Sequence, residues 1–113
     1  MLDGIIANTQ TLSSAGAGSL VIVWPRDISR NMPGIICIAT GTLTYNVEVT
    51  CDDITAPNYV AANGNWAPMS SVVSGATATV VTSLGAVVTA IRPHITSFSS
   101  GSLVFQFGQV FRT

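Results

Sequence analysis

The fold of this chain is decided by the stretch Thr42-Leu43-Thr44-Tyr45-Asn46-Val47-Glu48-Val49-Thr50-Cys51-Asp52. Apolar and polar residues alternate along it, and this pattern predicts a β-strand with one buried face and one exposed face. A register slip of one residue would turn every apolar side chain to water, so the pattern also fixes how the strand lies in its sheet. The expected buried face consists of Leu43, Tyr45, Val47, Val49 and Cys51.

Shorter apolar segments lie on both sides of this strand, separated by clusters of Gly, Pro, Asn and Ser. Gly41 is a candidate turn that would make residues 35–51 a hairpin, and residues 87–107 are predicted to form a second hairpin. About seven to eight short strands with such punctuation are typical of a single-domain β-sandwich or jelly roll. The further strands are predicted at 20–24, 35–39, 72–73, 77–82, 87–95 and 103–107.

The first 18 residues differ in composition from the rest of the chain. Residues 9–19 are small, polar and Gly-rich, which is typical of a loosely draped segment. We therefore predict an extended N-terminal arm over residues 1–18 and a β-domain over residues 19–113. The apolar pair Ile5-Ile6 either anchors the tip of this arm or pairs as an edge strand.

The composition excludes several classes of function. Of the 113 residues, 8% are charged, none is Lys, and the formal net charge is -1, so the chain is not expected to bind nucleic acid. The longest apolar runs, at 20–25 and 35–39, fall far short of the roughly 20 residues that a membrane helix needs. The N-terminus shows no secretory signal.

No constellation of residues predicts catalysis, a cofactor or a metal site. His94 is the one histidine, and no nucleophile motif accompanies it, so we expect a structural or surface role. Asp52-Asp53 is expected to form a turn rather than to bind calcium. Cys37 and Cys51 either face each other or are both small core residues, and free thiols are expected because no secretion signal is present.

The large aromatic residues and Arg92 allow more than one interpretation. Trp24, Tyr59 and Trp66 could line a sugar-binding groove, but core or interface filling is the preferred interpretation. Tyr45 belongs to the apolar face of its strand and is expected in the core. Arg92 either pairs with Glu48 across strands, which would fix the register, or contacts a neighbouring subunit.

Two blocks of the sequence resemble small structural proteins of tailed bacteriophages. The first block is residues 39–53, and the second runs from Gly85 to Arg92 and is followed by a Ser/Gly turn and an apolar strand. Trp66 lies between the blocks, as a Trp often does in such proteins. The resemblance covers roughly residues 39–109 and is closest in size and character to capsid cement, or decoration, proteins.

The resemblance implies a non-enzymatic virion protein that binds the outer shell between major capsid protein subunits. It would be made in the cytoplasm of the bacterial host, would lie on the capsid surface, and would form dimers or trimers. A tail or connector component and a carbohydrate-binding β-sandwich remain alternatives. The residues expected at the interface are Ile5, Ile6, Trp24, Trp66, Arg92 and Phe111.

Overall fold

A computed structural model describes residues 2–23, 33–84 and 88–112, and within these ranges it describes side chains from residue 7 to residue 109. No helix in these ranges has the length and apolar character needed to cross a membrane. The elements in chain order are β1 (Leu2–Leu12), β2 (Gly16–Ala17), β3 (Val21–Ile22), β4 (Gly34–Thr40), β5 (Leu43–Thr50), the 3-10 helix η1 (Ala61–Asn63), β6 (Ala67–Pro68), the 3-10 helix η2 (Ser71–Val73), β7 (Val80–Ser83), β8 (Ala90–Phe98) and β9 (Ser102–Arg112).

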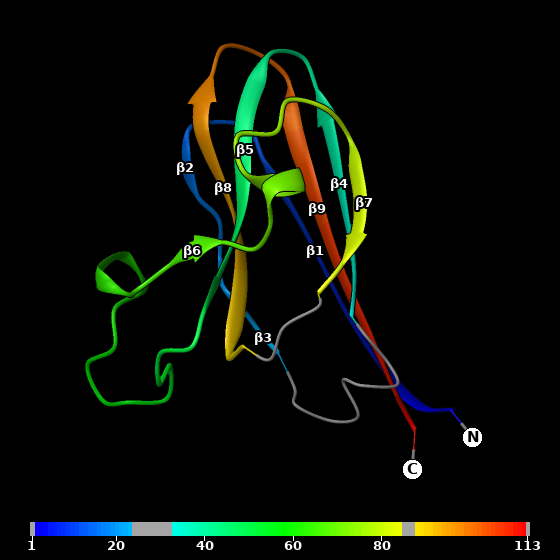
Figure 1. The fold of residues 1–113 in the computed structure, drawn as a ribbon, viewed down its shortest axis with the longest axis vertical. Coiled ribbons are helices and arrows are strands. Elements are labelled where there is room, and N and C mark those ends of the chain that lie inside the picture. Colours follow the sequence, from blue (N-terminus) through cyan, green and yellow to red (C-terminus); the bar gives the residue numbers. More distant parts are fainter. Residues whose placement is uncertain (1, 24–32, 85–87, 113) are drawn as a thin grey trace.

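The strands form two antiparallel sheets packed face to face (Figure 1). The four-stranded sheet has the order β1-β9-β4-β7, and the five-stranded sheet has the order β2-β8-β5-β6 with β3 also paired to β8. This confirms the predicted all-β sandwich. It has more strands than expected because β2, β3 and β6 are only two residues long.

The core lies between the two sheets and is made of alternate residues of their strands. Tyr45 is fully buried there, as predicted, and its hydroxyl donates a hydrogen bond to the Ala78 carbonyl oxygen at 2.6 Å. Complete burial of such side chains stabilises the fold by about 1.5–3 kcal/mol each. The other largest fully buried apolar side chains of the strands are Ile35, Val47, Ile91, Ile95, Leu103, Phe105 and Phe107.

Both predicted hairpins are wrong, because each pair of strands crosses from one sheet to the other. β4 lies in the four-stranded sheet and β5 in the five-stranded sheet, and β9 and β8 are divided in the same way. The actual partners are β4 with β9 and β5 with β8. The two connections are therefore arches over one end of the sandwich (Figure 1).

The two arches pack against each other through their backbones. Thr42 N–H donates to the Ser100 carbonyl oxygen at 3.0 Å, and Ser99 N–H donates to the Thr42 carbonyl oxygen at 2.9 Å. Gly41 and Gly101 have φ values of 78° and 91°, a region in which a side chain is strained. A Cβ at Gly101 would also collide with the carbonyl oxygen of Thr40. The close approach of the arches requires glycine at this position.

The structure differs from the predicted N-terminal arm. Residues 2–12 form β1, which pairs with β9 along its length, from Leu2 opposite Arg112 to Leu12 opposite Leu103. The Gln10 side chain then ties the following segment down, because its amide donates to the Ser19 carbonyl oxygen at 2.8 Å and accepts from Ser19 N–H at 2.9 Å. Ile5 and Ile6 therefore pair as part of an edge strand, which was the second of the two alternatives for them. The small polar residues that follow Leu12 come after this strand.

The two cysteines form no disulfide with each other and lie in different surroundings. Cys37 is buried on β4, and Cys51 is exposed just after β5, in the other sheet. Cys51 therefore does not continue the buried face of its strand as predicted, because β5 ends at Thr50. Burial raises the pKa of Cys37 to about 11, although a hydrogen bond with Tyr45 partly opposes this effect.

Candidate functional site

The outer face of the four-stranded sheet carries no charged residue among the side chains that the structure describes. We call it the uncharged face. The strand pairing aligns its residues in rows that run across the sheet. One such row consists of Thr9 on β1, Gln106 on β9, Ile36 on β4 and Val81 on β7. Its described members on these strands are Ala7, Thr9, Thr11, Ser102, Val104, Gln106, Gly108, Gly34, Ile36, Ile38, Thr40, Val81 and Ser83.

Strand β4 is apolar on both of its faces, but the described residues cover only one of them. Ile35 and Cys37 point into the core and are fully buried. Ile36 and Ile38 point outward with 36% and 41% of their surface exposed, and the neighbouring Val81 is 73% exposed. A strand that is apolar on both faces is typical of a sheet covered on both sides. The uncharged face therefore lacks the cover that its sequence calls for.

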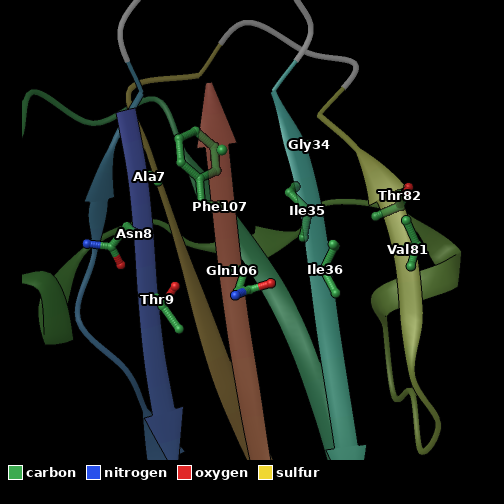
Figure 2. Close-up of a pocket in the computed structure, with 11 residues that line it drawn as sticks. Ala7, Asn8, Thr9, Gly34, Ile35, Ile36, Val81, Thr82, Gln106 and Phe107 are labelled. Atoms are coloured by element: carbon green, nitrogen blue, oxygen red, sulfur yellow. The ribbon is translucent and has the colours of Figure 1, made fainter. Parts of the chain in front are cut away.

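A hollow opens on the uncharged face where small residues of three strands meet between larger side chains such as Gln106, Ile36 and Val81 (Figure 2). In the register of the sheet, Gly108 lies opposite both Ala7 on β1 and Gly34 on β4. These residues, bordered by Ile36 and Val81, line an open depression of about 390 Å³. The hollow arises because three small residues meet on adjacent strands.

Neither glycine of the hollow is required by the backbone or by packing. Gly34 and Gly108 are absent from the positive-φ glycines of the described chain. A Cβ built on either of them meets no atom within 4 Å. Glycine inside a strand weakens the sheet and often marks a place where a ligand or another backbone approaches closely. The hollow is therefore open space that the described residues neither fill nor require for their own packing.

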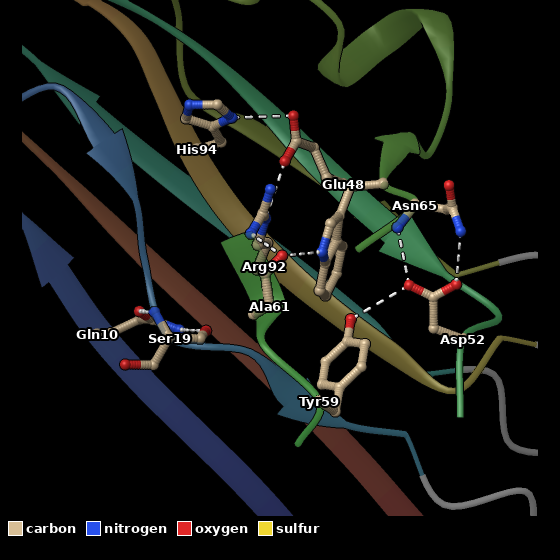
Figure 3. Close-up of polar contacts among 10 residues, drawn as sticks. Gln10, Ser19, Glu48, Asp52, Tyr59, Ala61, Asn65, Arg92 and His94 are labelled. Atoms are coloured by element: carbon tan, nitrogen blue, oxygen red, sulfur yellow. Dashed lines mark hydrogen bonds and ion pairs between the residues drawn. The ribbon is translucent and has the colours of Figure 1, made fainter. Parts of the chain in front are cut away.

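The outer face of the five-stranded sheet is different, because charged side chains pair on it (Figure 3). We call it the ion-pair face. Glu48 on β5 lies opposite Arg92 on β8. Arg92 Nε donates to Glu48 Oε1 at 2.9 Å, and His94 Nδ1 lies 3.0 Å from Glu48 Oε2. Because a carboxylate only accepts hydrogen bonds, His94 Nδ1 carries the proton in this contact.

These partners hold Glu48 in its charged form. Burial alone would raise the pKa of this carboxyl, but the hydrogen bonds from His94 and Arg92 outweigh burial and lower it below 4.5. Of the two alternatives for Arg92, the pairing with Glu48 across the strands is confirmed. The side chains of the pair are only 11% and 10% exposed, so both charges are satisfied inside the chain.

A loop of residues 51–66, which includes η1, covers the ion-pair face next to Arg92. The Arg92 guanidinium lies 4.2 Å from the centre of the Trp66 ring, a cation–π contact. Trp66 Nε1–H donates to the Ala61 carbonyl oxygen at 2.9 Å, and Arg92 Nη1 reaches the same oxygen at 3.4 Å. One side of the Trp66 ring is thus occupied by Arg92, which leaves a sugar only the other side for stacking.

Asp52 organises the interior of the same loop. Its carboxylate accepts hydrogen bonds from Asn65 N–H at 2.8 Å, from the Asn65 side chain at 3.1 Å and from the Tyr59 hydroxyl at 3.2 Å. Asp53 accepts from Thr55 N–H and its hydroxyl. The hydrogen bonds lower the pKa of both aspartates. The predicted turn-forming role is confirmed for Asp53, whose carbonyl oxygen also accepts from Ala56 N–H, whereas Asp52 bonds to residues farther along the loop.

The residues predicted at an interface fall into three groups. Trp66 and Arg92 come together on the ion-pair face, where they hold the 51–66 loop. Ile5, Ile6 and Phe111 lie in the paired ends of β1 and β9, and their side chains are outside the described set. Trp24 lies outside the described residues. Their role at an interface stays a prediction.

The described residues hold no group of three or more His, Cys, Asp or Glu side chains that could bind a metal ion. His94 is engaged with Glu48, and the two cysteines are far apart in the topology. The arrangement on the ion-pair face therefore serves to fix the register of β5 and β8 and to hold the loop.

The sequence interpretation missed the hollow and the exposed side chains of β4. The signal was present in Ile35-Ile36-Cys37-Ile38, an apolar run with no polar face. Such a run indicates that both faces of the strand are buried, either by this chain or by another protein. No sequence pattern predicted the hollow itself, because Gly34 and Gly108 are far apart in sequence and become neighbours only through the pairing of β4 with β9.

Comparison with known proteins gives little guidance. No family model matches the chain, and no curated protein matches it. Two chains of solved structure match, one of them from the endospore appendages of Bacillus, a family of disulfide-linked pili. That chain is 13% identical, the match covers 96% of the present chain and 89% of the other, and the TM-score is 0.34. A likeness at this level carries no argument about function.

Proposed function

We propose that this chain is a non-enzymatic structural protein of a bacteriophage virion, a cement or decoration protein of the capsid. It binds the outer shell between major capsid protein subunits and stabilises the head. After synthesis in the bacterial cytoplasm, it resides on the capsid surface. The uncharged face is the surface that makes this contact.

One observation carries the proposal: β4 exposes Ile36 and Ile38 on a face that no described residue of this chain covers. The core of a protein–protein interface is depleted of charged residues and packed as densely as a protein interior. The uncharged face meets the first requirement, and its hollow can accept a protruding side chain of the shell and so meet the second. The resemblance of residues 39–109 to phage structural proteins supports the choice of a virion as the assembly.

The face is also suited to binding that does not depend on ion pairs. Because it has no described charge, its binding depends on apolar burial and shape rather than on ion pairs, which salt screens. Burial of apolar surface contributes about 25 cal/mol per Å². We therefore expect attachment to shells to persist at high salt.

The test is cosedimentation with phage heads that lack this protein, followed by cryo-electron microscopy of the decorated heads. Gly108→Phe fills the hollow at a position where a new Cβ meets no neighbour, so it is expected to block attachment while the domain stays folded. Val60→Phe is the matched control, because Val60 is 52% exposed in the 51–66 loop, away from the uncharged face.

Density repeated over the shell, with the uncharged face against the major capsid protein, is the expected result. Density confined to the tail would move the site to the alternative tail or connector role. Full attachment of Gly108→Phe would overturn the assignment of the binding face.

A further inference from the structure

The edges of the two sheets are unequal. β7, at one edge of the four-stranded sheet, has four residues, and the strands at the edges of the five-stranded sheet, β2, β3 and β6, have two each. β1, at the remaining edge, has 11 residues. Proteins commonly protect sheet edges by keeping edge strands short, because unpaired N–H and C=O groups pair with other chains. Every edge of the described sandwich follows this rule except β1.

β1 lacks the other protective devices as well. From Gly4 to Leu12 it contains no proline and no charged residue. Its register with β9 is continuous over this stretch, and the one irregularity lies between Leu2 and Gly4. The Gln10 contact to Ser19 is made by the side chain, and no strand lies on the outer side of β1 in the described topology. From Gly4 onward the outer edge is therefore a continuous, uncharged template for another strand.

We propose that two copies of this chain associate through their β1 strands, which pair antiparallel about a two-fold axis. Such a contact is self-complementary, since the same edge is used on both copies. A charge near the axis would face its own copy, which destabilises cross-strand pairs, and β1 has none from Gly4 onward. The strand thus suits a second copy of itself.

The pairing joins two four-stranded sheets into one of eight strands. Thr9 and Thr11 stand on the outer face beside the edge and are exposed, so they are available for cross-strand threonine contacts. The uncharged faces of the two copies then form one surface. The inference uses the backbone edge of β1 and does not depend on the proposed attachment of the face to a shell.

Hydrogen exchange of the full chain, measured by NMR at low and high protein concentration, tests the pairing directly. In a single copy, alternate β1 amides bond to β9 and the others face solvent. We expect the solvent-facing set between Ile5 and Leu12 to become protected as concentration rises, together with dimer formation in sedimentation velocity. Alternate amides that exchange rapidly at every concentration, with a monomer throughout, would overturn the proposal.

Paired proline variants separate the two edges of the strand. Neighbouring N–H groups point to opposite edges, so one of Asn8→Pro and Thr9→Pro removes a bond to β9 and the other removes an outward donor. An edge strand tolerates proline when its N–H faces solvent. The tolerated variant is expected to keep the thermal midpoint of the monomer and to lose the dimer. Dimers that persist in both variants would contradict β1 pairing.

A lysine pair provides a control that does not alter the backbone. Thr11→Lys places a charge on the pairing strand β1 and is expected to weaken dimerisation severalfold. Val81→Lys adds the same charge to the same face at the opposite edge, on β7, and is expected to leave the dimer unchanged. Equal weakening by both variants would point to association through the face instead of the edge and would overturn the proposal.

Discussion

The two outer faces of the sandwich have opposite chemistry. On the ion-pair face, Glu48, Arg92 and His94 satisfy one another, and the 51–66 loop covers them. On the uncharged face, Ile36 and Ile38 stand in the open beside a hollow that nothing in the described chain fills. The charged side chains of the ion-pair face are thus satisfied within the chain, while the apolar side chains of the uncharged face are left exposed by the described residues.

The physical reason lies in what each kind of group needs. A buried charge is costly unless a partner satisfies it, so Arg92 and Glu48 had to be paired when the chain folded. An exposed apolar side chain needs no partner within the folded chain, and a second protein can cover it later. Paired charges near an ordered loop are therefore weak evidence for a binding site, and an uncovered apolar strand face is better evidence.

Among changes on the two faces, the loss of Arg92 is expected to have the largest effect. Arg92→Met takes the guanidinium from Glu48, which keeps only its contact with His94 among these two partners, and removes the cation above Trp66. Breaking a buried ion pair from one side costs about 3–5 kcal/mol, so we expect a loss of about 3 kcal/mol in urea unfolding. The matched change on the uncharged face, Gln106→Met, is expected to alter stability by less than about 0.5 kcal/mol. Similar losses in both variants would remove the distinction between the faces.

Trp66→Ala should have a smaller effect, confined to the loop. It removes a cation–π contact and a partly buried aromatic surface, together worth about 2 kcal/mol. We expect faster proteolysis within residues 51–66, measured by mass spectrometry of the fragments. Tyr59→Phe is the control, because it keeps a ring and loses only the hydrogen bond to Asp52. Proteolysis that starts elsewhere would show that Trp66 does not hold the loop.

Acid should weaken the ion-pair face specifically. The folded-state pKa of Glu48 lies below its ordinary value of 4.5, so its contribution is complete above the unfolded-state pKa and is lost as pH falls through the folded-state pKa. Asp52 and Asp53 shift in the same direction. Urea unfolding across this acidic range should show a shallower pH dependence for Glu48→Gln than for the wild type. Ile36→Thr should leave the slope unchanged, and a slope that Glu48→Gln does not alter would contradict this assignment.

The smallest expected effect on stability belongs to Gly108→Val. A valine fits a strand better than glycine by roughly 0.5–1 kcal/mol, and its Cβ has open space at this position. We therefore expect unchanged or slightly raised thermal stability together with weaker attachment to heads. Gly101→Val is the contrasting change, because its Cβ would collide with the Thr40 carbonyl oxygen, and this variant is expected to unfold. Marked destabilisation by Gly108→Val would show that the hollow is needed for folding.

Some of the site was accessible from the sequence. The alternation in residues 42–52 placed Tyr45 in the core and Glu48 on the opposite face, and the single charge in the 87–92 stretch suggested the Arg92–Glu48 pair. The turn role of Asp53 followed from side-chain chemistry. The partner residues Asn65, Tyr59 and Trp66 could not be assigned to the same loop cluster, because no local pattern shows how a 16-residue connection folds back on itself.

By itself the sequence determined an all-β sandwich of low charge, because strand alternation and the scarcity of charged residues are local properties of the chain. Only the tertiary structure decided that the strands on either side of Gly41 and Gly101 cross between sheets, since an arch and a hairpin have the same alternation. It also decided that residues 2–12 complete a sheet, and that Gly34 and Gly108 meet in a hollow. These features depend on which distant strands pair, and pairing is settled by the whole core at once.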